Sequence, residues 1–121
     1  MKILLLALLS IGMSVAAQFA LKAGMATERA QTAFAALPRP GAMLQLFTVP
    51  GIAIGFALYG LGAVVWLAVL SRWDVSKAYP LVGVGFALAV GIGWLLGESV
   101  NAQRIAGVAL IVAGIVLTAR S

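Results

Sequence analysis

Hydrophobic residues fill four long stretches of this chain, and polar residues gather in the connections between them. The stretches are residues 3–22, 50–70, 78–97 and 101–119. A hydrocarbon core of about 30 Å is crossed by about 20 helical residues, a length that each stretch meets or approaches. Only the fourth has a charge in its interior, Arg104, which lies close enough to its start to reach the headgroups. The pattern predicts an all-α membrane protein with four transmembrane helices in a single domain, 1–121.

The connection between the first two stretches is the only long one. It runs from Gly24 to Val49 and contains the sequence Pro38-Arg39-Pro40-Gly41. Proline removes a backbone donor and disfavours the helical conformation of the residue before it, so no continuous helix passes through this cluster. We expect an interfacial loop with one or two short helices. The other two connections are short, which predicts that the helices they join are antiparallel neighbours.

The third stretch has a proline, Pro80, near its start, and Gly83 and Gly85 follow it. Proline weakens the backbone hydrogen bonding of a helix, and glycine reduces its side-chain bulk. We therefore expect a helix bend at these three residues. Polar residues that could cap the helices precede the third stretch at Asp74 and Ser76, and the fourth at Ser99 and Asn101.

The composition restricts the chain to proteins that reside in a membrane. Of the 121 residues, 64% are hydrophobic and 9% are charged, which is too little polar surface for a water-soluble globule. Cysteine and histidine are absent, which removes thiolate and imidazole chemistry. The only acids, Glu28, Asp74 and Glu98, lie outside the apolar stretches, so paired-carboxylate catalysis is not expected within them. We expect no enzyme activity, no catalytic residue, no metal and no cofactor.

The net charge of +5 indicates contact with a membrane surface rather than with nucleic acid. The eight Lys and Arg residues lie at the ends of segments, without the basic stripe or interleaved aromatics of a nucleic-acid site. Four of them fall on each side of the membrane, so charge counting leaves the orientation open. Such a balance suits insertion in both orientations or a partner that fixes the topology. The two sets are Lys2, Arg72, Lys77 and Arg120, and Lys22, Arg29, Arg39 and Arg104.

Polar side chains recur at every fourth position of the first stretch. Ser10, Ser14, Gln18 and Lys22 are otherwise surrounded by Leu, Ile, Ala, Val, Met and Gly. On a helix, residues four apart lie one above the other and advance about 40° per step, so these side chains form a polar ridge. In so apolar a chain, the polar ridge is the leading candidate for a substrate-binding site.

Two other interpretations of the polar ridge remain open. Ser14 and Gln18 could bond a neighbouring helix, while Lys22 extends to the headgroups. The sequence Val15-Ala16-Ala17 also resembles a signal cleavage site before Gln18. Because three further apolar stretches follow, we expect the first helix to be retained.

Glycines mark the faces along which these helices are expected to pack. Small residues let helix backbones approach closely in lipid, where no hydrophobic effect drives helices together. Gly51 and Gly55 are four residues apart in the second stretch, and Gly107 and Gly114 lie on one face of the fourth. Four helices do not easily enclose a transport route, so we expect at least a dimer, with Gly107 and Gly114 at the subunit contact.

Four short motifs follow one another along the chain and cover nearly all of it apart from Gly24 to Val49. In order and spacing they resemble the drug/metabolite transporter superfamily, in its four-span members of the EamA-like and small-multidrug-resistance-like type. The motifs are Ser14-Val15-Ala16-Ala17-Gln18 with Lys22, Trp66-Leu67-Ala68-Val69-Leu70, Val75-Ser76-Lys77-Ala78-Tyr79-Pro80-Leu81, and Gly97-Glu98 before Gly107 and Gly114-Ile115-Val116.

Two branches of that superfamily resemble the chain to different degrees. Small multidrug resistance exporters use a membrane-embedded glutamate in the first span, and Ser14 stands at that place here. The subunits that flip aminoarabinose-linked undecaprenyl phosphate for lipid A modification are more similar. They share the serine, small residues, glutamine and lysine of the first span and the Ala78-Tyr79-Pro80 opening of the third.

The second resemblance implies a flippase subunit in the bacterial inner (cytoplasmic) membrane. Its partners would be a membrane lipid or lipid-linked sugar and a second four-span protein, in a homodimer or a heterodimer. Lys22 would pair with the lipid phosphate, Gln18 and Ser14 would offer hydrogen bonds beside Ser10, and Tyr79 would stack on the sugar. The alternatives are a small-multidrug-resistance-like exporter of small molecules and a non-transporting membrane interaction subunit.

Overall fold

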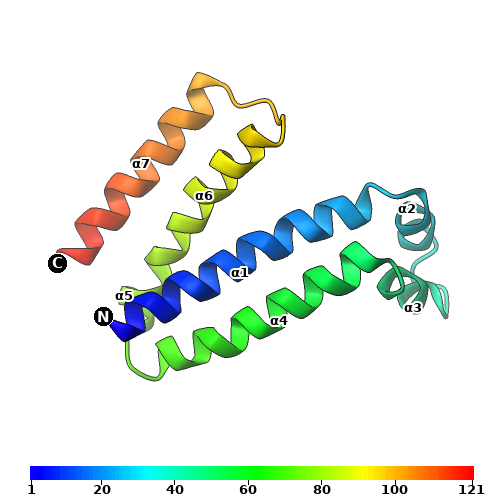
Figure 1. Cartoon of the computed structure of the whole chain (residues 1–121), viewed down its shortest axis with the longest axis horizontal. Helices are drawn as coiled ribbons and strands as arrows, with labels where there is room; N and C mark the ends of the chain where they lie inside the picture. The colour runs from blue at the N-terminus through cyan, green and yellow to red at the C-terminus, as the bar shows by residue number, and fades with distance from the viewer.

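The computed structural model describes residues 1–121 and consists entirely of helices and their connections. Four of its helical segments are long and apolar enough to cross a membrane, so the expected fold class is confirmed. Two short helices stand between the first two spans, where an interfacial loop or helix was expected (Figure 1). The elements are α1 (Lys2–Met25), α2 (Glu28–Ala35), α3 (Ala42–Phe47), α4 (Pro50–Leu70), α5 (Val75–Ala78), the 3-10 turn η1 (Tyr79–Leu81), α6 (Val82–Leu95) and α7 (Ala102–Ala119).

Helices α1 and α4 run antiparallel and in contact along their length (Figure 1). Glycine makes this contact close: a Cβ atom added to Gly51 would lie 2.7 Å from both the Cα and the N atom of Gly24. A Cβ atom on Gly55 would lie 2.6 Å from the side chain of Leu21. The two backbones therefore meet directly at the α2–α3 end of the pair, as small residues permit in membranes.

Helices α6 and α7 form a second antiparallel pair, which diverges from the first (Figure 1). Gly83 provides the contact within this pair, because a Cβ atom there would lie 2.6 Å from the Ile115 side chain of α7. Gly85 faces the other way, 3.0 Å from Ile11 of α1 by the same construction. Ile115 is the one buried residue of α7. The last helix is thus held to the chain through α6 alone over most of its length.

The third span is interrupted where the proline was noted. Helix α5 follows Asp74 and lasts four residues, the 3-10 turn η1 contains Pro80, and α6 begins at Val82. Proline lacks the N–H that a continuous α-helix would use, so the backbone forms a 3-10 turn here instead of a continuous α-helix. The span begins at Val75 and ends at Leu95, a few residues before the expected 78–97 at both ends.

Short helices α2 and α3 form a small apolar cluster at one end of the α1–α4 pair. Thr27 begins α2 by accepting a hydrogen bond from the Ala30 N–H, at 3.2 Å. Arg29 of α2 donates to the hydroxyl of Thr48, just after α3. The buried residues of the cluster are Ala30, Ala33, Leu46, Val49 and Ile52.

The turn between α6 and α7 is fixed at both of its ends. At the first, the Glu98 N–H donates to the Gly93 carbonyl over 2.9 Å, and Gly97 has a φ of +94°, which glycine adopts without strain. At the second, the Asn101 side chain accepts from the Arg104 N–H at 2.8 Å. Asn101 is therefore the residue that caps α7, rather than Ser99.

Candidate substrate cavity

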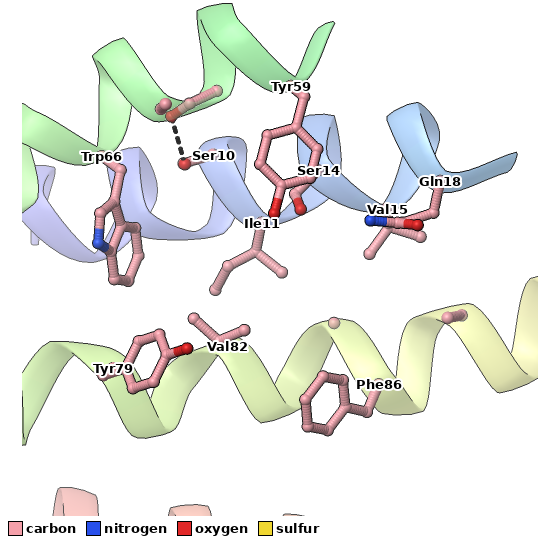
Figure 2. Close-up of a pocket in the computed structure, with 14 residues that line it drawn as sticks. Ser10, Ile11, Ser14, Val15, Gln18, Tyr59, Trp66, Tyr79, Val82 and Phe86 are labelled. Carbon is pink, nitrogen blue, oxygen red and sulfur yellow. Dashed lines mark hydrogen bonds between the residues drawn. The ribbon is translucent and has the colours of Figure 1, made fainter. Parts of the chain in front are cut away.

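A cavity of about 470 Å³ lies between α1, α4 and the η1–α6 segment (Figure 2). It extends from Ser14 and Gln18, at and beyond the midpoint of α1, to Trp66 and Tyr79 near the ends of their spans. Helix α7 contributes nothing to the lining. The lining residues are Ser10, Ile11, Ser14, Val15, Gln18, Tyr59, Gly62, Ala63, Trp66, Tyr79, Val82, Gly85, Phe86 and Ala89.

Helical periodicity explains how α4 builds one wall of the cavity. Tyr59, Gly62, Ala63 and Trp66 stand at positions i, i+3, i+4 and i+7, which share one helix face. The two small residues leave space between the two large aromatic ones. Figure 2 shows Tyr59 and Trp66 projecting from α4 past α1 toward the opposite helix.

Ser10 holds the α1–α4 side of the cavity together. Its hydroxyl donates a hydrogen bond of 2.6 Å to the backbone carbonyl of Gly62, and its side chain is buried (Figure 2). A Cβ atom added to Gly62 would lie 3.4 Å from the Ser10 carbonyl oxygen, in ordinary van der Waals contact with α1. The Ser10 hydroxyl is therefore already used as a donor within the chain.

Two further members of the polar ridge face the cavity with unused hydrogen-bonding groups. Ser14 and Gln18 line it, and neither side chain bonds another group of the chain. The same holds for the hydroxyls of Tyr59 and Tyr79. The cavity thus offers hydroxyl and amide groups that both donate and accept.

Lys22 lies on α1 but outside the cavity lining. Three steps of four residues turn the polar ridge by about 120° between Ser10 and Lys22 and carry it about 18 Å along the axis. The Lys22 side chain is exposed near the end of α1, next to α2. The structure therefore brings Ser10, Ser14, Gln18 and Tyr79 to one cavity and leaves Lys22 beyond its edge.

The cavity contains no charged side chain. All three acids of the chain, Glu28, Asp74 and Glu98, are exposed and belong to the ends of helices or to connections. A cargo that enters this space meets neutral dipoles and aromatic rings rather than a carboxylate. No carboxylate of the chain lies in the lining, where it could bind a cation or carry a proton.

The remaining candidate residues occupy two separate places. Pro80 belongs to η1, and Gly83 and Gly85 form the close contacts of α6 with α7 and α1. Gly107 and Gly114 lie on α7, where an added Cβ atom would meet no other atom of the chain within 4 Å. Their face is therefore open.

Three aromatic residues of the lining, Tyr59, Trp66 and Phe86, were not predicted from the sequence as cavity residues. Trp66 was noted there only within a motif. The sequence nevertheless contains a pattern that predicts the α4 wall of the cavity, because Tyr59 and Trp66 are seven residues apart with Gly62 and Ala63 between them on the same helix face.

Four apolar spans, three of which line an uncharged cavity, are typical of a small multi-pass membrane protein such as a transporter subunit. Comparison with curated proteins places the chain more narrowly. It is 31% identical over 118 residues to the "Probable 4-amino-4-deoxy-L-arabinose-phosphoundecaprenol flippase subunit ArnE" of Pseudomonas fluorescens, a match that covers 97% of this chain and 96% of the relative. The chain belongs to the family of these flippase subunits.

Other relatives match over shorter segments. The subunit of the same name from Pseudomonas savastanoi is 43% identical over 63 residues, which is 51% of this chain and about half, 55%, of the relative. The "Uncharacterized protein y4nH" of Sinorhizobium fredii is 35% identical over 88 residues, 71% of this chain and 75% of the relative. These relatives are named as flippase subunits or are uncharacterized, and not as enzymes. No family model and no solved structure matches the chain.

Proposed function

We propose that this chain is one subunit of a flippase in the bacterial inner membrane that moves an undecaprenyl-phosphate-linked sugar, of the aminoarabinose type, between the leaflets. The observation that carries the proposal is the charge-free cavity between three apolar spans, with unused hydroxyl and amide groups on α1. The names of the relatives supply the chemical class of the cargo: an amino sugar, a phosphate and a polyprenyl chain. The polyprenyl chain stays in lipid while the headgroup passes through the cavity.

Lys22 receives the phosphate as the headgroup enters. It is exposed near the end of α1 and stands two turns, about 12 Å, from Ser14 in the cavity. Gln18 lies between them on the same ridge. A phosphate that pairs with the ammonium at the membrane surface is thereby brought to the mouth of a space whose own groups are neutral.

Ser14, Gln18 and Tyr79 then provide hydrogen bonds to the sugar hydroxyls and the phosphate oxygens. Each of these three side chains lines the cavity without a partner in the chain. Polar groups of a cargo lose water on entering a membrane, and hydrogen bonds made in the cavity offset part of that cost. Ser10 supports the site by holding α1 against α4.

The proposal is tested by measuring the transfer of a polyprenyl-phosphate sugar from one leaflet to the other in proteoliposomes. We expect Lys22→Glu to abolish cargo binding, because the reversed charge repels the phosphate. Arg39→Glu is the matched control, since it makes the same charge change in the exposed loop before α3 and leaves the α1 ridge intact. Equal cargo affinity of wild type and Lys22→Glu would remove the phosphate-pairing role. A wild-type protein that moves no such lipid, either alone or reconstituted with a related four-span partner, would refute the proposed function.

A second four-span subunit, identical or related, completes the transporter by packing on α7. The open face of Gly107 and Gly114 supports this arrangement, as does the exposure of nearly every α7 side chain. We expect Gly114→Leu to lower the crosslinked dimer fraction in membranes. Gly91→Leu serves as the control, because Gly91 of α6 is equally open but lies off this face. Equal losses in the two variants would argue against α7 as the contact.

A further inference from the structure

Aromatic rings make up much of the cavity surface and come from both of its sides. Tyr59 and Trp66 belong to α4, Tyr79 to η1 and Phe86 to α6. Figure 2 shows Trp66 and Tyr79 pointing into the cavity from opposite helices. The Trp66 side chain packs against the apolar cluster of Ala7, Val69 and Ala78, and it makes no hydrogen bond within the chain.

The chain itself contains an example of what an indole ring can bind. The Nζ atom of Lys77 lies 4.6 Å from the centre of the Trp73 ring, a cation–π contact at the membrane end of the third span. Trp66 lies about one helix turn before the end of α4 and has no cation beside it among the lining residues. An ammonium group that enters with the cargo would find this ring unoccupied by the protein's own charges.

The net charge of the headgroup explains why the cargo would need an ammonium group. A sugar-linked phosphodiester carries one negative charge, and the cavity lining has no cation to neutralise it. Burying an unpaired charge away from water is strongly unfavourable. An amine on the sugar makes the headgroup zwitterionic, so its net charge is zero while it crosses the middle of the membrane.

We propose that Trp66 and Tyr79 hold the ammonium group of the cargo sugar through cation–π contacts, and that the cavity thereby selects amino sugars over neutral ones. This inference rests on the proposed function and specifies which group of the cargo Trp66 and Tyr79 bind. The hydroxyls and amides of α1 bind the rest of the headgroup and do not distinguish an amine from a hydroxyl. Selectivity comes from the α4 and η1 side of the cavity.

Three synthetic short-chain polyprenyl phosphates test the inference by binding to the purified full chain. The first carries 4-amino-4-deoxyarabinose, the second its N-acetyl derivative, which has no charge on nitrogen, and the third arabinose. We expect wild type to bind the amino lipid about fivefold to thirtyfold more tightly than the other two, the range that one or two partly desolvated cation–π contacts provide. Trp66→Leu should lower the affinity for the amino lipid more than the affinity for the N-acetyl lipid, and so remove this preference.

Further variants separate recognition from folding. Tyr79→Leu alters a side chain that is 66% exposed, so it tests the same contact without disturbing a packed region. Trp94→Leu is the matched control, because Trp94 is 64% exposed on α6 and outside the lining; it should retain the full preference. Equal affinity of wild type for the amino and N-acetyl lipids, or an equal loss for both in Trp66→Leu, would overturn the inference and leave the proposed function standing. A wild-type protein that binds none of the three lipids would overturn both.

Discussion

Replacing Gly51 by alanine tests the closest contact between spans, that of α1 with α4. The added Cβ atom would lie 2.7 Å from the Cα and N atoms of Gly24 and 2.8 Å from the Ala20 carbonyl oxygen. All three are backbone atoms, which cannot rotate away as a side chain can. Relief requires α1 to move as a whole.

The size of the effect follows from two opposing terms. Overpacking a well-packed contact costs about 1–3 kcal/mol, and a contact made only with backbone belongs at the upper end of that range. Alanine in a helix recovers up to about 1 kcal/mol relative to glycine. We therefore expect Gly51→Ala to lower the free energy of unfolding by about 2 kcal/mol, close to a thirtyfold change in the folded-to-unfolded ratio.

Gly60→Ala is the internal control for this prediction. Gly60 lies on the same helix, and an added Cβ atom there would meet nothing within 4 Å, so its variant should be as stable as wild type or slightly more stable. Reversible unfolding in mixed micelles, followed by circular dichroism and tryptophan fluorescence, measures both variants. If Gly51→Ala and Gly60→Ala shift the unfolding transition in the same direction, α1 and α4 do not make the direct backbone contact described here.

Two further variants test single hydrogen bonds. Ser10→Ala removes the 2.6 Å bond to the Gly62 carbonyl and should lower the free energy of unfolding by about 0.6–2 kcal/mol in the same assay. Ser71→Ala, whose hydroxyl bonds only a carbonyl of α4, should have little effect, and equal shifts for the two variants would show that Ser10 does not join the helices. Asn101→Ala removes the cap on the Arg104 N–H and should destabilise α7 by about 1 kcal/mol, seen as faster amide hydrogen exchange in its first turn; unchanged exchange would contradict the cap.

The four spans could be predicted because their cause is local. A run of apolar residues of the right length forms a helix in lipid whatever it packs against, since its backbone must satisfy its own hydrogen bonds. The second span illustrates this: proline suits the first turn of a helix, and α4 has the expected bounds, Pro50–Leu70. The first helix extends to Met25, because nothing between Lys22 and Met25 stops it.

The cavity was predictable only in part, because its cause is the packing of helices distant in the sequence. Ser10, Ser14 and Gln18 were found from their spacing within one helix. Tyr59 was missed because α4 is apolar on all sides, so no polar face marks its inward surface. Lys22 lies outside the lining because each four-residue step turns the side chain about 40° further around the helix, so the last member of the repeat no longer faces the cavity.

The direct backbone contact between Gly24 and Gly51 and the Ser10 bond to Gly62 join α1 and α4 at two places along their length. Two of the three cavity walls are therefore fixed to each other, and any widening must come from the third. That wall is α6, which starts at the 3-10 turn and extends away from it as a lever. Tyr79 lies in that turn and would hardly shift, whereas Ala89, about 10 Å beyond the start of α6, would move furthest of the lining residues.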